Sequence, residues 1–163
     1  MDFDFYPWVA FGYNNSGLNT YPGIMKSHRE FILITTKNKE EIINITPQIE
    51  KICRNSKIKE GITFVFPHHT SSAVYISDSD KRLTSDFLKV LSNLVPSGGD
   101  YVHNKVDSKE NADAHIKATL TGHNITIPIS NGKLDLGQYE TIYYAEFDGM
   151  REKEILVKII GEE

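Results

Sequence analysis

Short runs rich in β-branched and aromatic residues recur along the chain and restrict it to a fold dominated by strands. Runs of this kind, bounded by turn residues, are typical of β-strands. Asn131-Gly132 separates two of them and is a strong signal for a two-residue hairpin, and Asp148-Gly149 predicts a further hairpin. The predicted strands span residues 31–36, 40–45, 61–66, 72–77, 124–129, 133–136, 141–147 and 154–160.

Helical spacing of apolar residues interrupts these strands. Residues 46–55 begin with Thr46-Pro47, an N-cap followed by a proline at the first helical position. Residues 84–95 place apolar side chains on one face, with Thr84 or Ser85 as the cap. A third helix is expected to begin near Asp113. Strands therefore do not alternate regularly with helices, which predicts an α+β fold with a mainly antiparallel sheet and two or three helices.

Length and charge exclude several classes of function. A chain of 163 residues is expected to form one domain with a substantial core. The net charge of -4 gives no electrostatic support to nucleic-acid or membrane-surface binding, although a local basic pocket can still bind a small anion. The single cysteine, Cys53, is expected to be a small buried hydrophobe. Without a basic leader or a long apolar segment, the chain is expected to be cytoplasmic.

The first 27 residues differ from the rest of the chain. They are rich in aromatic residues, glycine and asparagine and show neither a helical nor a strand period. Because so many aromatic rings would be costly to leave in water, we expect this N-terminal arm to pack on the domain or on a neighbouring subunit. The domain itself is expected over residues 28–163.

Three histidines carry the clearest chemical signal. His69 follows an apolar run, His103 follows a Gly98-Gly99 break, and His115 lies at the expected start of the third helix. Their polar surroundings predict a shared functional site. Three imidazoles can bind a divalent metal and leave a position open for water or substrate, but their spacing matches no local metal motif such as HExxH. A metal-free site, in which imidazoles move protons or bind anions, is the alternative.

Other side chains near these histidines suit an anionic ligand. The hydroxyls of Thr70 and Ser71, together with that of Ser72, directly follow His69 and can donate to a phosphate or a metal-bound water. Lys117 and the first amides of the third helix can hold the same anion. The structural alternatives are local turn capping for the hydroxyls and a solvated helix residue for the lysine.

Five strings resemble the YjbQ family, also called secondary thiamine-phosphate synthases. They follow the family's order from about His28 to the C-terminus and leave the aromatic arm uncovered. The strings are HTSSAV (69–74), LVPSGGDYVHN (94–104), NADAHIKATLTG (111–122), TIPISNGKLDLG (126–137) and YYAEFDG (143–149).

The resemblance implies a compact, β-sandwich-like domain that assembles as a homotrimer. It also implies a site around His69, His103 and His115, with Thr70, Asn104 and Lys117 beside them. The chain departs from the family pattern at two places, where Ser77-Asp78 replaces Asn-Glu and where Gln138-Tyr139-Glu140 replaces Thr-Trp-Gln. These departures concern the choice of substrate more than the histidines.

The resemblance implies weak synthesis of thiamine phosphate from a pyrimidine pyrophosphate and a thiazole phosphate. A metal-dependent hydrolase of a small phosphorylated or acyl compound is a second hypothesis, because zinc suits imidazole ligands better than magnesium does. A trimeric ligand-binding or metal-binding protein without enzymatic activity is a third. All three share a small phosphorylated ligand or a metal, with zinc as the expected cofactor, and none involves nucleic acid or a membrane.

Overall fold

The computed structural model describes residues 24–163, so most of the predicted arm lies outside the described residues. Eight strands and three α-helices follow one another along this part of the chain. They are β1 (Lys26–Thr35), β2 (Glu41–Asn44), α1 (Thr46–Ser56), β3 (Glu60–Pro67), β4 (Ser72–Asp78), α2 (Lys81–Leu94), α3 (Ala112–Thr121), β5 (Ile125–Ser130), β6 (Lys133–Leu134), β7 (Glu140–Glu146) and β8 (Glu152–Glu162), with a short 3-10 helix, η1 (His103–Lys105), before α3.

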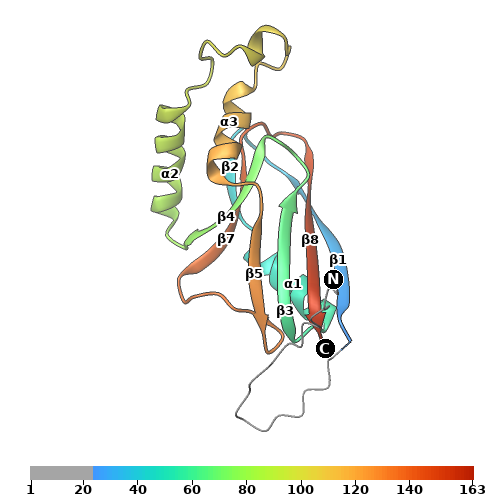
Figure 1. The fold of residues 1–163 in the computed structure, drawn as a ribbon. Coiled ribbons are helices and arrows are strands. Elements are labelled where there is room, and N and C mark those ends of the chain that lie inside the picture. Colours follow the sequence, from blue (N-terminus) through green and yellow to red (C-terminus); the bar gives the residue numbers. More distant parts are fainter. Residues whose placement is uncertain (1–23) are drawn as a thin grey trace, which may run out of the picture.

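The strands form two antiparallel sheets (Figure 1). The larger has the order β1-β8-β3-β5-β6, and the smaller has the order β2-β7-β4. The expected α+β class with a mainly antiparallel sheet is therefore confirmed. The hairpin at Asn131-Gly132 is also confirmed, because both residues have positive φ and connect the paired strands β5 and β6. Among the described helices, none is long and apolar enough to cross a membrane.

The predicted hairpin at Asp148-Gly149 is wrong. The strands before and after it, β7 and β8, belong to different sheets, so this segment is a crossover between the two layers. A Cβ at Gly149 would collide with the Thr36 hydroxyl, and Gly149 N donates to the Lys39 carbonyl at 2.9 Å. A glycine is thus required here by close packing against the β1–β2 connection. The dipeptide Asp-Gly is also typical of hairpin turns, so the sequence alone cannot distinguish the two cases.

Two helix starts also differ from the predictions. α2 begins at Lys81, and its N-cap is Asp80, whose carboxylate accepts from the Arg82 amide. Thr46 is the first residue of α1 and does not cap it; its hydroxyl accepts from Ile142 N on β7 instead. Local sequence therefore did not predict either cap. The Thr46 hydroxyl contacts a distant strand, and the carboxylate of Asp80 caps α2 before Thr84 is reached.

The layers explain which faces are buried. Aliphatic side chains from the inner faces of both sheets and from α1 form the main core, including Ile49, Val65, Ile142 and Ile159. A second cluster covers the opposite face of the small sheet with α3 and α2. The small sheet is therefore buried on both sides, as the burial of every residue of β7 after Glu140 shows. Within the described part, the large sheet is packed on its inner face only.

A buried carboxylate joins the ends of both sheets. Glu146, at the end of β7, has no exposed surface, and its Oε1 accepts from Lys153 Nζ at 3.2 Å and Ser71 Oγ at 3.3 Å. The amides of Phe147 and Asp148 donate to the same oxygen, and the Tyr144 hydroxyl donates to Oε2 at 2.5 Å. Burial, together with the neighbouring Glu146 charge, raises the pKa of Tyr144, so this hydroxyl remains a donor. One side chain thus fixes the β3–β4 turn, the crossover and β8.

Replacing Glu146 by Gln should destabilise the fold by about 3–5 kcal/mol, because the buried Lys153 ammonium would lose its counter-charge. The measurement is the free energy of unfolding in urea. Glu50→Gln is the matched control, since Glu50 forms an exposed pair with Arg54 at 3.9 Å and its loss should leave the unfolding midpoint unchanged. A Glu146→Gln protein as stable as the control would contradict this role.

Candidate functional site

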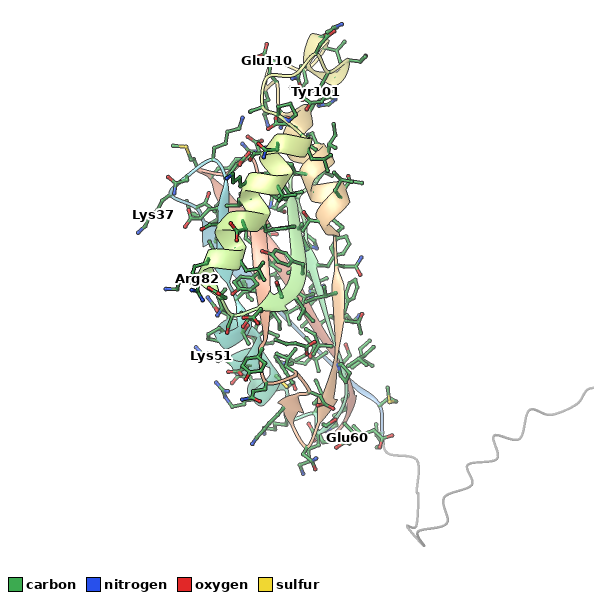
Figure 2. The ribbon with its side chains drawn as sticks, turned by 90° about the vertical axis from the view of Figure 1, so that its left-hand side faces the viewer. Lys37, Lys51, Glu60, Arg82, Tyr101 and Glu110 are labelled. Atoms are coloured by element: carbon green, nitrogen blue, oxygen red, sulfur yellow. The ribbon has the colours of Figure 1, made fainter. Side chains whose placement is uncertain are left out.

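The site lies at the end of the molecule where the loop of residues 95–111 meets α3. Figure 2 shows Tyr101 and Glu110 of this loop at one end and Glu60 at the other. The loop approaches the helix because Asn104 Oδ1 accepts from the Ala112 amide at 3.0 Å. Asn104 thereby satisfies one of the free amides at the start of α3. Asn104 was expected to bind a ligand, and the structure shows its side-chain oxygen in a capping contact that positions the loop.

His115 is oriented by the turn between β3 and β4. Its Nδ1 lies 3.2 Å from the carbonyl oxygen of Thr70. A carbonyl can only accept, so Nδ1 carries the proton and Nε2 of a neutral ring is left as an acceptor. The Thr70 backbone, more than its hydroxyl, is thus what the structure shows acting on His115.

His103 is placed against a carboxylate. Its Nε2 is 3.3 Å from Asp107 Oδ2, an ion-pair distance across one turn. The backbone amide of Lys109 donates to Asp107 and, together with the charge of His103, lowers the pKa of Asp107. Asp107 can accept a hydrogen bond from His103 Nε2, as the Thr70 carbonyl does from His115 Nδ1, so each ring is held by an acceptor at one nitrogen.

The two imidazoles face the same hollow. Their ring centroids are 5.3 Å apart and the rings are nearly perpendicular, at 84°. Both rings line a pocket of about 520 Å³ whose remaining walls are mostly apolar. These walls are formed by Thr70, Tyr101, Val102, Ala112 and Ile116.

His69 is not part of this pocket. Its Nε2 accepts from the Glu154 amide at 3.1 Å, which holds the ring beside the start of β8. Burial, helped by the nearby charge of Lys153, lowers the pKa of His69. The structure therefore brings His103 and His115 together. The third expected histidine, His69, lies outside the pocket and is hydrogen-bonded in its neutral form.

The residues present do not form the expected three-histidine metal centre. Among residues 24–163, no group of three or more His, Cys, Asp or Glu side chains is arranged to hold a metal ion. A zinc site needs three or four such ligands at about 2.0–2.3 Å. His103 and His115 alone do not meet this requirement.

The expected anion-binding side chains Lys117 and Ser71 are buried elsewhere. Lys117 is 1% exposed, and its Nζ donates to Glu40 at 2.5 Å and to Asp113 at 3.2 Å. Burial by itself lowers the pKa of Lys117, but these two hydrogen bonds outweigh it and raise that pKa. Ser71 is held by Glu146 and Lys153. Neither side chain lines the pocket, and in these positions both connect layers of the fold.

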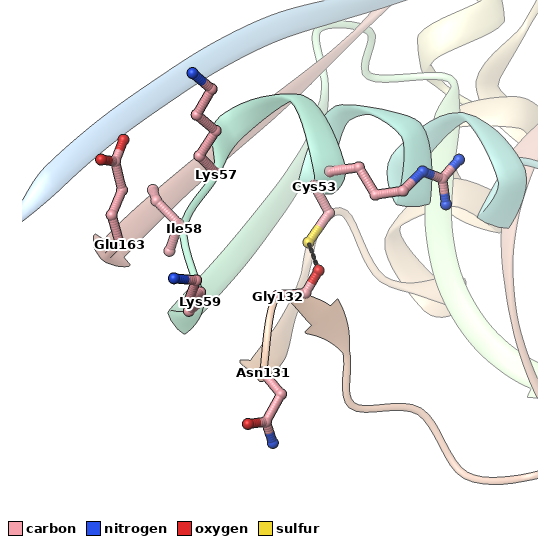
Figure 3. A pocket seen from close by; sticks show the side chains of 8 residues that line it. Cys53, Lys57, Ile58, Lys59, Asn131, Gly132 and Glu163 are labelled. Carbon is pink, nitrogen blue, oxygen red and sulfur yellow. Dashed lines mark hydrogen bonds between the residues drawn. The ribbon is translucent and has the colours of Figure 1, made fainter.

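A second hollow, of about 450 Å³, lies near the C-terminal end of α1 (Figure 3). Cys53 borders it and donates to the Gly132 carbonyl across a distance of 3.7 Å. Burial raises the pKa of the Cys53 thiol, so the residue stays protonated and agrees with the predicted structural role. The neighbouring Lys57 is the C-cap of α1 in a left-handed conformation, and its backbone amide donates to the Arg54 carbonyl.

Three partners of the expected site residues were missed by reasoning from sequence. Asp107 follows His103 by four residues, and Asp113 precedes Lys117 by four, so helical spacing was the available signal for both pairs. Glu40 lies 77 residues from Lys117 and gave no local signal. Only the packing of the β1–β2 connection against α3 brings that carboxylate to the lysine.

Comparisons with known proteins place the chain among poorly characterised relatives. The pattern of the family described as "UPF0047 protein YjbQ-like" matches residues 30–162. A "UPF0047 protein" of Archaeoglobus fulgidus is 40% identical over 79% of this chain and 98% of its own length. One from Methanothermobacter thermautotrophicus is 36% identical over 84% and 94%. The crystal structure of a "YbjQ-like protein of unknown function" from Sulfolobus solfataricus has a TM-score of 0.81, with 34% identity over 85% of this chain and 99% of its own.

These findings correct the expected functions. The relatives are named only by family, and none of these names carries a thiamine-phosphate synthase activity. Lys117, which was expected to hold the anionic group of the ligand, is enclosed by carboxylates. The metal-dependent hydrolase and the metal-binding protein lack their metal centre among the described residues. The thiamine-phosphate synthase prediction and its metal-based alternatives are therefore withdrawn.

The stability of the protein should fall as the pH drops below about 6.5, because of His69. In the folded state the lowered pKa keeps its ring neutral, whereas the unfolded chain takes up a proton near the ordinary value of 6.5. Because the unfolded chain then binds more protons than the folded chain, the free energy of unfolding decreases as the pH falls. The contribution of His69 to stability is therefore complete above pH 6.5 and is lost as the pH falls toward the pKa of the folded state. His69 is partly exposed, so the slope should stay below about 1.4 kcal/mol per pH unit.

Urea unfolding between pH 7.5 and 5.5 measures this slope. His69→Gln keeps an acceptor for the Glu154 amide but does not titrate, so its slope should be smaller than that of the wild type. His123→Gln is the control, because it removes another histidine, one whose ring packs edge-on against Phe66. Equal slopes in all three proteins would refute the assignment.

Proposed function

The chain belongs to the UPF0047 protein YjbQ-like family, and on that premise we propose that its His103–His115 pocket is an acid–base site for a small molecule. The ligand has an apolar body and an anionic group, such as a phosphate. The observation that carries this proposal is that two imidazoles with different partners line the same pocket. A carbonyl fixes the His115 proton on Nδ1, while a carboxylate faces His103.

The two settings assign different tasks to the two rings. His115 offers an unprotonated Nε2, which suits a general base. His103 is held at Nε2 by Asp107, and when its ring is protonated its other nitrogen can donate to an anion or to a leaving atom. Perpendicular rings 5.3 Å apart reach different atoms of one small ligand.

The walls of the pocket define the rest of the ligand. Val102, Ala112 and Ile116 are aliphatic, and Tyr101 adds an aromatic ring. A flat apolar body of the size of a substituted ring suits these walls and a volume of about 520 Å³. Among the residues that line the pocket, Thr70 has the one alcohol group on a short side chain, so the arrangement favours proton transfer over a covalent intermediate.

Phenyl phosphate is the simplest probe with these two parts. Wild-type protein should bind it more tightly than inorganic phosphate, because the ring adds contact with the apolar walls. His103→Gln and His115→Gln should each weaken binding by about tenfold, or 1.4 kcal/mol, in calorimetric titration. His123→Gln removes a histidine outside the pocket and should bind like the wild type. If the two pocket variants bind as well as this control, the proposed site is in the wrong place.

The predicted zinc cofactor can be tested with the same titration. Protein treated with a chelator should bind phenyl phosphate as strongly as untreated protein, because the donors present provide two imidazoles and no third ligand within residues 24–163. Elemental analysis before and after treatment is the control. Binding that is lost on chelation and restored by zinc would instead support a metal whose further ligands come from beyond these residues.

We also propose that the pocket lies at a boundary between subunits of a homotrimer. Four aliphatic side chains on the η1 loop and α3 are exposed beside it, namely Val102, Val106, Ile116 and Leu120. Val102 and Val106 are 78% and 86% exposed, which is costly for a surface that stays in water. A second copy of the chain placed over them would also close the open side of the pocket.

Light scattering should therefore give a mass three times that of the 18.5 kDa chain. Val106→Lys should lower this mass, because a charge would enter an apolar interface. Tyr139→Lys is the matched control, since Tyr139 is 65% exposed on the loop between β6 and β7. A wild-type protein that runs as a monomer at micromolar concentration would rule out the trimer.

A further inference from the structure

The outer face of the large sheet is unusually apolar for a surface that faces solvent. Sheets of antiparallel strands with one buried face normally carry polar residues on the other. Here the outward side chains include Phe31 and Leu33 on β1, Ile62, Phe64 and Phe66 on β3, and Leu156 on β8. Phe31, Leu33 and Ile62 are 42%, 56% and 46% exposed. We call this surface the outer sheet face.

These side chains form one continuous surface and not isolated contacts. Strand register places Phe31 opposite Leu156, and Leu156 opposite Phe66. The rings of Phe64 and Phe66 stack with centroids 5.8 Å apart. The two core clusters lie inside the sandwich and beyond the small sheet, so neither of them covers this surface. Figure 1 likewise shows α2 and α3 on the side of the small sheet.

Two cations stand side by side on the outer sheet face. Arg29 on β1 is directly opposite Lys158 on β8, and both point outward with the aromatic residues. Arg29 also lies over the Phe31 ring, 5.7 Å from its centroid. Like charges in directly opposed cross-strand positions destabilise a sheet. An acidic group placed over this pair would relieve the local repulsion. Glu152 and Glu154 on β8 point outward on the same face, so the surface as a whole favours an aromatic occupant whose acids lie near Arg29 and Lys158.

We infer that the N-terminal arm of the same chain, residues 1–23, binds the outer sheet face. The arm carries seven aromatic residues and two acids, Asp2 and Asp4, and no basic residue. Its composition therefore complements a face of phenylalanines around an arginine–lysine pair. This inference is independent of the histidine pocket and concerns a different surface.

The attachment point and length of the arm agree with this placement. The arm joins β1, the edge strand of the large sheet, through Ile24 and Met25. An extended segment of 23 residues spans up to about 75 Å, roughly twice the length of a ten-residue strand, so it can run back along the whole face. The Sulfolobus structure is matched over 99% of its length but 85% of this chain, and the family pattern begins at residue 30. The arm is thus an addition to the shared domain, attached where the apolar face begins.

The chain contains one tryptophan, Trp8, which lies in the arm and reports on it directly. In the full-length protein its fluorescence should be blue-shifted relative to the urea-unfolded chain and protected from iodide. Phe31→Lys and Ile62→Lys place charges on the outer sheet face. Each should shift the emission toward that of the unfolded chain and restore quenching. Val90→Lys, at an exposed aliphatic position on α2, should change neither.

Circular dichroism separates loss of binding from loss of folding, because Phe31 and Ile62 are exposed enough for lysine to be accommodated. Two results would overturn the inference. One is a Trp8 signal that matches the unfolded chain in the wild type, or that is blue-shifted and stays so in both variants. The other is a change of mass in light scattering without any change in Trp8 emission, which would show that a second copy of the chain covers the face.

Discussion

The buried Glu146 carboxylate is the interaction on which the rest of the structure depends. It neutralises Lys153 on the neighbouring sheet and accepts hydrogen bonds from the β3–β4 turn and from the crossover that follows β7. A buried charge is costly unless its partner and its hydrogen bonds are all present, so these segments must be correctly placed together. The β3–β4 turn held in this way also carries the Thr70 carbonyl that orients His115. The chemistry of the pocket thus rests on an ion pair that is itself inaccessible to any ligand.

Two buried lysines share this logic. Lys117 contacts Glu40 of the β1–β2 connection and Asp113 of its own helix, and Lys153 contacts Glu146 of β7. Lys117 was itself expected to act on a ligand, and Lys153 holds Ser71, which was expected to do the same. The fold uses their charges to fix layers to one another. What remains accessible is the pair of imidazoles, held by neutral and charged acceptors of different kinds. These two imidazoles and the apolar walls around them support the proposed acid–base site.

The two sheets differ in how they are covered, and this difference organises the surfaces of the molecule. The small sheet is enclosed by the core on one side and by α3 and α2 on the other, so the site built on α3 rests on a rigid support. The large sheet packs on its inner face, and its outer face presents aromatic residues around two cations. The exposed aliphatic residues beside the pocket form a separate surface at the end of the molecule. Assembly and arm binding are therefore assigned to different parts of the domain.

The sequence by itself determined the elements of the domain and its family. Seven of the eight strands and all three helices follow from apolar periodicity and turn residues to within a few positions, and the 133-residue family match follows from motifs such as those around His69 and His115. Local letters could not determine which strands pair, because Asp148-Gly149 has the same turn chemistry in a hairpin as in a crossover. Nor could they show that His69 hydrogen-bonds to β8 while His103 and His115 meet across a pocket, or that Glu40 reaches Lys117 from 77 residues away. Residue types and spacings specify which groups can act, whereas their partners are set by contacts between distant segments, which only the packed layers bring within hydrogen-bonding distance.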